Sequence, residues 1–130
     1  MSIRAYEEVI RGEAPLAVVG LGYVGLPIAL AFAARMPVIG FDIREENIDL
    51  LRTGRDPSQE MPAEAFAGKN ITFTSDPATL KAARVYIIAV PTPIDKTNNP
   101  DLSALLGASR IVGEALSEGD LVVYESTVYP

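Results

Sequence analysis

Three glycines near the amino terminus have the spacing of a loop that can hold a diphosphate. Gly20, Gly22 and Gly25 follow an apolar run and open a helical stretch, which gives the pattern G-x-G-x-x-G. In that context the first glycine permits a tight turn, the second lets the backbone approach a pyrophosphate, and the third lets helix and strand pack closely. The free amides and dipole of the helix favour negative charge there. The alternative is that the glycines serve packing alone, but it does not explain why they stand between an apolar run and a helical stretch.

An acidic residue stands where a dinucleotide-binding unit would need one. Asp42 closes the next apolar run, 22 residues after Gly20. A carboxylate at this position accepts hydrogen bonds from the hydroxyls of the adenosine ribose and repels a 2′-phosphate, so it favours NAD over NADP. Two alternatives stay open, because Asp42 can also cap a helix and the guanidinium of Arg44 could receive a 2′-phosphate.

Two further candidate segments follow the last two predicted strands. Val90, Pro91 and Thr92 come after one of them, and the other is followed by three candidates, namely Glu125, Ser126 and Thr127. Ligands of parallel α/β sheets bind beyond the carboxyl ends of the strands, where the strand order reverses. A threonine hydroxyl there can bond a cofactor or position a water. For the proline-flanked Thr92, ordinary turn chemistry is the competing explanation.

The composition excludes several classes of function. The chain of 130 residues has no cysteine and no histidine, which excludes a thiolate or histidine metal site, a cysteine nucleophile and a Ser-His-Asp triad. The formal charge of −6, without a long basic run, argues against nucleic acid or an anionic membrane as partner. We expect one domain that contains no metal site.

The periodicity predicts short apolar strands separated by helices. We expect strands over residues 16–20, 37–42, 71–74, 85–90 and 121–124. We expect helices over 23–35, apolar nearly all round and therefore largely buried, and over 44–52, with a helical turn near 63–66. Parallel pairing with right-handed crossovers follows, hence an α/β, Rossmann-type doubly wound sheet of strand order 3-2-1-4-5.

Capping residues mark the remaining helices. Asp76 before Pro77 signals a helix start, and Gly54 suits the end of the preceding helix. Asp101 can cap a long helix that Gly119 ends. Its apolar residues recur at helical spacing and are Leu102, Leu105, Leu106, Val112 and Leu116.

One stretch resembles a membrane span by length alone. Residues 14–34 carry no charge, but the glycines and Pro27 inside the stretch favour a strand, a turn and a buried helix. The preceding residues 1–14 carry charges and lack the apolar centre of a signal peptide, which predicts a cytoplasmic protein.

Four ordered motifs together resemble one enzyme family. They are GLGYVGLP at 20–27, VPTPID at 90–95, NPDLS at 99–103 and YESTVYP at 124–130. The chain from about Leu16 onward is similar to the UDP-glucose/GDP-mannose dehydrogenase family, especially its UDP-N-acetylhexosamine 6-dehydrogenase branch. The resemblance implies an NAD-binding domain in an enzyme that oxidises the C6 alcohol of a UDP-sugar to a carboxylate by two hydride transfers, usually as a homodimer.

The resemblance also implies roles for individual residues. Those that would contact or flank NAD are Gly22, Tyr23, Val24, Asp42, Val90, Thr92 and Thr127. Thr127 would in addition help to place a water or substrate oxygen, a catalytic role. Where many relatives carry a basic residue this chain has Asn47, for which Arg44 is a candidate substitute. We expect the family's cysteine, lysine and asparagine, with a sixth strand, to lie downstream of Pro130. The 130 residues are therefore expected to bind cofactor and to catalyse nothing.

Two other interpretations compete with this one. A hydroxyacid or 6-phosphogluconate type of dehydrogenase could carry a similar glycine loop, although the segments at 90–95 and 124–130 speak against it. A dinucleotide-sensing module without chemistry would have no need of a hydroxyl at Thr127.

Overall fold

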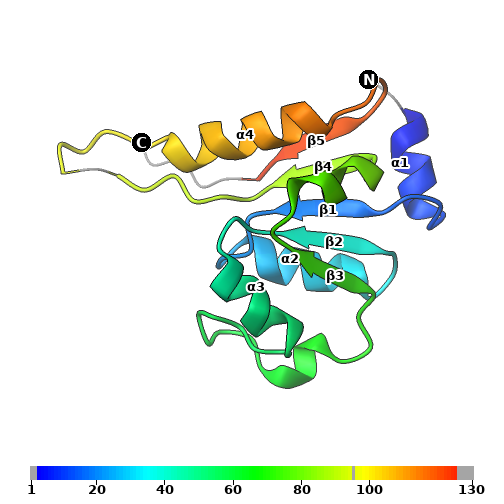
Figure 1. Cartoon of the computed structure of the whole chain (residues 1–130), viewed down its shortest axis with the longest axis horizontal. Coiled ribbons are helices and arrows are strands. Elements are labelled where there is room, and N and C mark those ends of the chain that lie inside the picture. The colour runs from blue at the N-terminus through cyan, green and yellow to red at the C-terminus, as the bar shows by residue number, and fades with distance from the viewer. Residues whose placement is uncertain (1–2, 95, 126–130) are drawn as a thin grey trace.

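The computed structural model, which describes residues 3–94 and 96–125, is a five-stranded parallel sheet with helices on both faces (Figure 1). The strands are β1 (Leu16–Val19), β2 (Val38–Phe41), β3 (Ile71–Thr74), β4 (Val85–Ile88) and β5 (Leu121–Tyr124). The helices are α1 (Ile3–Ile10), α2 (Gly25–Ala33), α3 (Glu45–Arg52) and α4 (Ser103–Ala115), with 3₁₀ helices η1 (Ala63–Phe66) and η2 (Pro77–Ala82). The order β3-β2-β1-β4-β5 confirms the predicted doubly wound fold.

The three central strands are buried on both faces, as continuous apolar runs require. Alternate residues of β1 enter different cores: Val18 packs in one with α1, α2 and α3, and Val19 packs in the other with η2 and α4. Figure 1 shows α2 behind the sheet and α4 on the opposite side, and α3 shares the core of α2. Because the chain changes sides between β3 and β4, β1 and β4 lie next to each other at the switch point.

Helix α2 is shorter and less buried than its composition predicts. It covers nine residues and buries one face, while Phe32 on its outer face is 37% exposed. The expectation of a largely buried helix holds for five of its nine residues, and the others are exposed or half-buried because only one side of α2 meets the sheet. Because α2 begins at Gly25, the missing amide of Pro27 falls among the first helical positions, which need no partner within the helix. None of the helices within the described residues is long and apolar enough to cross a membrane.

Helix α4 differs most from its prediction. Of the apolar residues that recur at helical spacing, Val112 is buried but Leu106 is 61% exposed, and the other buried residues of the helix are Ala108 and Ala115. It ends at Ala115, before Gly119, and Leu102 occupies the N-cap position in place of Asp101. The carboxylate of Asp101 still accepts hydrogen bonds from the backbone amide and hydroxyl of Ser103. Small residues face the sheet because they allow the helix axis to approach it.

The other turns and caps largely follow the sequence. Strand β3 and helix η1 have their predicted bounds, and the carboxylate of Asp76 accepts the amide of Ala78 at 3.0 Å. Gly54 has a φ of 79° after α3, as its predicted place beyond the helix end requires. Strand β4 ends at Ile88, two residues before its predicted end.

An ion-pair group joins the amino terminus to the opposite end of the strands from the glycine loop. The guanidinium of Arg84 pairs with Asp120 at 2.6 Å and with Glu8 of α1 at 3.0 Å. Beside it, the hydroxyl of Tyr86 donates to the carbonyl of Leu80 at 2.6 Å, which fastens β4 to η2. Burial, with the nearby Asp120 carboxylate, raises the pKa of Tyr86 to about 12.

Candidate functional site

A pocket of about 480 Å³ lies at the switch point, beyond the carboxyl ends of β1, β2 and β4. It is enclosed between the glycine loop, the start of α3 and one face of α4. The lining residues are Val19, Gly20, Leu21, Gly22, Phe41, Asp42, Ile43, Arg44, Asn47, Val90, Pro91, Ser103, Ala104, Gly107, Ala108 and Ile111. Its size and apolar walls suit a small organic ligand.

The three glycines of the loop are needed for three different reasons. Gly20 has a φ of +99°, and a Cβ there would lie 2.8 Å from Cγ1 of Val90. A Cβ on Gly25 would lie 1.6 Å from the carbonyl oxygen of Gly20, so no side chain fits. Gly22 is the opposite case, because its Cβ would meet nothing within 4 Å. Space is left beside Gly22, on the wall of the pocket, where a ligand can approach the backbone.

The amino-terminal end of α2 lies beside this loop. Its N-cap residue Val24 supplies no side-chain hydrogen bond, so no side chain of the cap neutralises the first amides. The helix dipole favours an anion at this end of α2. Tyr23 is 73% exposed and Val24 40% exposed, so both present their side chains to solvent at the loop. The arrangement fits the phosphates of a dinucleotide.

Asp42 is held in place by backbone amides before any ligand arrives. One carboxylate oxygen accepts from the amide of Leu21 in the glycine loop and the other from the amide of Arg44, each at 3.1 Å. Each carboxylate oxygen has two lone pairs, so the group can still accept from two hydroxyls. The side chain is only partly buried and lines the pocket.

Arg44 and Asn47 line the same wall of the pocket. Within the described part of the chain the guanidinium of Arg44 forms no salt bridge, so it is available to a ligand. Ile43, which stands between Asp42 and Arg44 in the chain, is 70% exposed and places an apolar side chain at the edge of the pocket. The sequence had not singled out Ile43.

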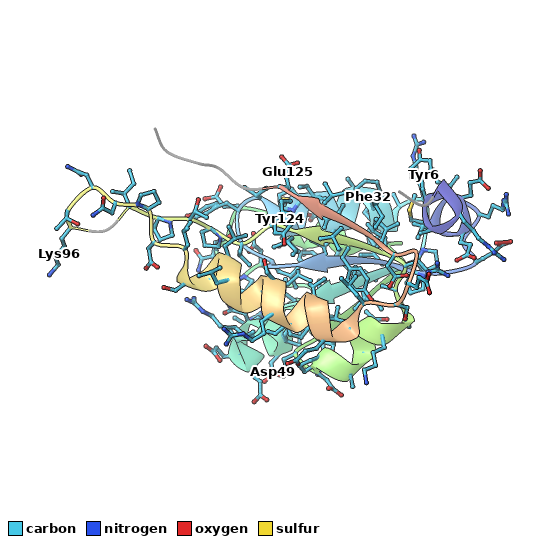
Figure 2. All side chains as sticks on the ribbon, turned by 90° about the horizontal axis from the view of Figure 1, so that it is seen from above. Tyr6, Phe32, Asp49, Lys96, Tyr124 and Glu125 are labelled. Atoms are coloured by element: carbon cyan, nitrogen blue, oxygen red, sulfur yellow. The ribbon has the colours of Figure 1, made fainter. Side chains whose placement is uncertain are left out.

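Some of the residues predicted at the strand ends line the pocket and others do not. Val90 and Pro91 line the pocket, whereas Thr92 is 4% exposed and is absent from the lining. Glu125 follows β5, and its amide donates to the carbonyl of Ile88 at 2.8 Å while its side chain is exposed. Figure 2 shows Glu125 beside Tyr124 at the end of this edge strand. Ser126 and Thr127 lie outside the described residues.

The wall formed by α4 was missed by sequence reasoning, which attended to its leucines. The residues concerned are Ser103, Ala104, Gly107, Ala108 and Ile111. The available signal was the recurrence of small residues four apart on the helix face away from Leu102 and Leu106.

A second hollow, of about 630 Å³, lies between the end of α3, η1 and β3. Its basic residues are Arg52, whose Nε donates to the carbonyl of Phe73 at 3.0 Å, and Lys69. The carboxyl end of α3 borders it, and that end of a helix disfavours anions. It is also more open than the pocket at the switch point, which we therefore take as the candidate site.

The candidate site can bind but carries little that can react. Among the described residues of its lining, the ionisable ones are Asp42 and Arg44. Both are placed to recognise a ligand's hydroxyls or charge, and neither adjoins a nucleophile. The geometry supports recognition of a ribose and a diphosphate.

Comparison with known proteins identifies the family. The family model described as "UDP-glucose/GDP-mannose dehydrogenase family, NAD binding domain" matches residues 14–130. Protein CapL of Staphylococcus aureus is 52% identical over 115 residues, which are 88% of this chain and 27% of CapL. UDP-N-acetyl-D-glucosamine 6-dehydrogenase of Pseudomonas aeruginosa is 47% identical over 116 residues, 88% of this chain and 28% of that protein.

Solved structures give the same result. UDP-D-ManNAc dehydrogenase from Pyrococcus horikoshii is 38% identical with a TM-score of 0.76, over 89% of this chain and 29% of that one. A ternary complex of GDP-mannose dehydrogenase from Pseudomonas aeruginosa is 31% identical with a TM-score of 0.78, over 88% of this chain and 29% of that one. The chain thus spans little more than a quarter of the curated relatives that it matches.

Proposed function

The chain belongs to the UDP-glucose/GDP-mannose dehydrogenase family, whose NAD binding domain it is, and on that premise we propose that the pocket at the switch point holds the adenosine and diphosphate of NAD. The observation that carries the proposal is the carboxylate of Asp42, fixed at 3.1 Å to the glycine-loop amide of Leu21 while it faces the pocket. The same contact joins the ribose-binding group to the phosphate-binding loop.

Each residue of the site has a proposed part in holding the cofactor. Asp42 accepts from the ribose hydroxyls and repels a 2′-phosphate, which selects NAD over NADP. The backbone at Gly22, together with the amides that follow it at Tyr23 and Val24, binds the diphosphate, and Gly20 and Gly25 keep the loop against β1.

The remaining contacts extend the site along the sheet edge. Val90 and Pro91 bound the cofactor at the end of β4, and Arg44 lies beside the adenosine in place of a basic residue at Asn47. We also assign cofactor contacts to Thr92, Glu125, Ser126 and Thr127, on the resemblance of the segments 90–95 and 124–130 to the family. Thr127 is the residue to which we give a catalytic role.

We propose that the whole protein oxidises the C6 alcohol of a UDP-hexose or UDP-N-acetylhexosamine to the uronate, in the cytoplasm and as a homodimer. The names of the matched relatives support this activity, and we propose that the product serves polysaccharide synthesis. Bound NAD would accept the hydride removed from the sugar. The 130 residues contain no cysteine, so we expect them to bind NAD without turning over a UDP-sugar.

A fluorescence titration with NADH, with NADPH in parallel, tests the cofactor assignment. We expect saturable binding of NADH and binding of NADPH that is weaker by about tenfold or more, because a second anion beside Asp42 is repelled. A folded chain that binds neither nucleotide, or that prefers NADPH, would refute the assignment.

The role of Thr127 needs the full-length enzyme. There Thr127→Ala should lower kcat more than it raises the Kd for NADH, because the hydroxyl is assigned to the reacting end of the cofactor. An unchanged kcat would refute the catalytic role of Thr127, and a full-length protein that binds NADH without any turnover would favour the dinucleotide-sensing alternative.

A further inference from the structure

One wall of the pocket is a helix face that carries small side chains. Ser103, Ala104, Gly107 and Ala108 present this face of α4 to the pocket, and Ile111 closes it one turn further on. Across the pocket lie residues of the β2–α3 turn, among them the exposed Ile43. The two walls enclose a narrow apolar space next to Asp42.

Gly107 stands near the middle of α4, where a glycine is costly. A glycine in a helix interior is about 1 kcal/mol less favourable than alanine. A Cβ at Gly107 would meet no atom within 4 Å, so packing does not require the glycine. Since Gly107 lines the pocket, any side chain there would instead take volume from it.

If the proposed function is right, the position of Asp42 indicates which part of the ligand occupies the pocket volume beside Gly107. If the carboxylate binds the ribose hydroxyls, the base on the same ribose lies within a few ångströms of it. The diphosphate occupies the glycine-loop side, which leaves the space between Ile43 and α4 for the base. We infer that Gly107 is a specificity-determining residue: it sets the width of the slot that admits the flat adenine ring.

The test uses a matched glycine on the same helix. Gly113 lies in α4, its Cβ would also meet nothing within 4 Å, and it does not line the pocket. Gly107→Ala and Gly113→Ala should both raise the Tm, because alanine is the better helix former. Only Gly107→Ala should weaken NADH binding, by about threefold for one methyl in an apolar slot.

A longer side chain enlarges the contrast. Gly107→Leu should weaken NADH binding by about tenfold or more, since several methylenes then fill the slot, while Gly113→Leu should stay within about twofold of the original chain. Circular dichroism of each variant checks the fold, and the alanine pair decides the matter if the leucine variant does not fold. An undiminished NADH affinity in both Gly107 variants, or an equal loss in the Gly113 variants, would overturn the inference. Failure of the unmodified chain to bind NADH would instead refute the proposed function on which the inference rests.

Discussion

The two crossovers that flank the site are built in opposite ways. Between β1 and α2 the chain spends only residues 20–24, and the helix is pressed so closely on the loop that Gly25 has no room for a Cβ. The connection between β4 and α4 consists of residues 89–102. It projects from the body of the molecule, and Lys96 lies near its far end (Figure 2). The first crossover leaves no space behind the loop, and the second leaves a pocket in front of the helix.

The difference shows that one residue type serves two contrary purposes. At Gly25 glycine is required because the carbonyl of Gly20 already occupies the position of a side chain. At Gly107 it is required, by our inference, because space has to be left for a ligand. A diphosphate is bound by close backbone approach, whereas a planar base needs a gap between two walls. Three predictions test this contrast, and a fourth concerns a loop outside both crossovers.

The largest effect is expected at the tight crossover. Gly25→Ala should lower the free energy of unfolding by about 3 kcal/mol or more, because backbone atoms 1.6 Å from the new Cβ have to move. Chemical denaturation measures the change, with Gly113→Ala as the control in an open position. An unaltered unfolding free energy would show that the two crossovers do not differ as described.

Asp42 is expected to have the next largest effect, on binding. Asp42→Asn places an amide group against one of the two N–H donors at Leu21 and Arg44 and removes the charge. NADH affinity should fall by a factor that corresponds to about 2 kcal/mol, the worth of hydrogen bonds to a charged group. NADPH should lose less, so the preference between the nucleotides narrows. A preserved preference for NADH in this variant would argue against the ribose role.

A substitution at Gly22 should affect ligand binding without affecting stability in the β1–α2 connection. Gly22→Ala should leave the Tm within a few degrees of the original because the Cβ meets nothing within 4 Å. NADH binding should fall by about tenfold, since the methyl group stands where a phosphate approaches the backbone. Titration and thermal unfolding on the same sample compare the two effects. Binding as strong as in the original chain would remove Gly22 from the proposed phosphate site.

The smallest effect concerns Asp56, in the loop between α3 and η1. Its buried carboxylate accepts from the amides of Ser58, Glu60 and Met61 and from the Ser58 hydroxyl. Burial opposes ionisation, but these hydrogen bonds outweigh it and hold the pKa of Asp56 below its usual value of 3.8. The carboxylate therefore stabilises the fold above pH 3.8, and that stability is lost as the pH falls through the lower folded pKa.

Asp56→Asn tests this and leaves both crossovers intact. It should cost about 1 kcal/mol at neutral pH, because the new amide NH₂ would face either the two N–H donors of Glu60 and Met61 or the N–H and hydroxyl of Ser58. It should also flatten the loss of stability below pH 4, measured by denaturation at several pH values. NADH affinity should not change. A weakened NADH affinity would mean that the loop is coupled to the site. An unchanged loss of stability below pH 4 would mean that another carboxylate causes that loss.

Local signals in the sequence were the most reliable. Strand β3 was predicted with its observed bounds, and Asp76 forms its predicted hydrogen bond, because neighbouring residues decide both. Burial was predicted less well. Leu106 shares the helical spacing of the buried Val112 and is nevertheless 61% exposed, and Phe32 lies on an open face of α2. Periodicity shows that residues share a helix face, but it does not show which face meets the sheet.

The sequence alone determined the glycine loop, Asp42 and the doubly wound fold. The glycine loop and Asp42 depend on a strand, a turn and a helix that follow one another within about 25 residues, so short-range spacing specifies them. The fold follows from strands that alternate with helices along the chain. Only the tertiary structure decided that the face with Gly107 becomes the opposite wall of the pocket. That wall lies 65 positions from Asp42 in the chain. Its place depends on how far a long connection lets α4 stand from the sheet edge, which no local pattern encodes.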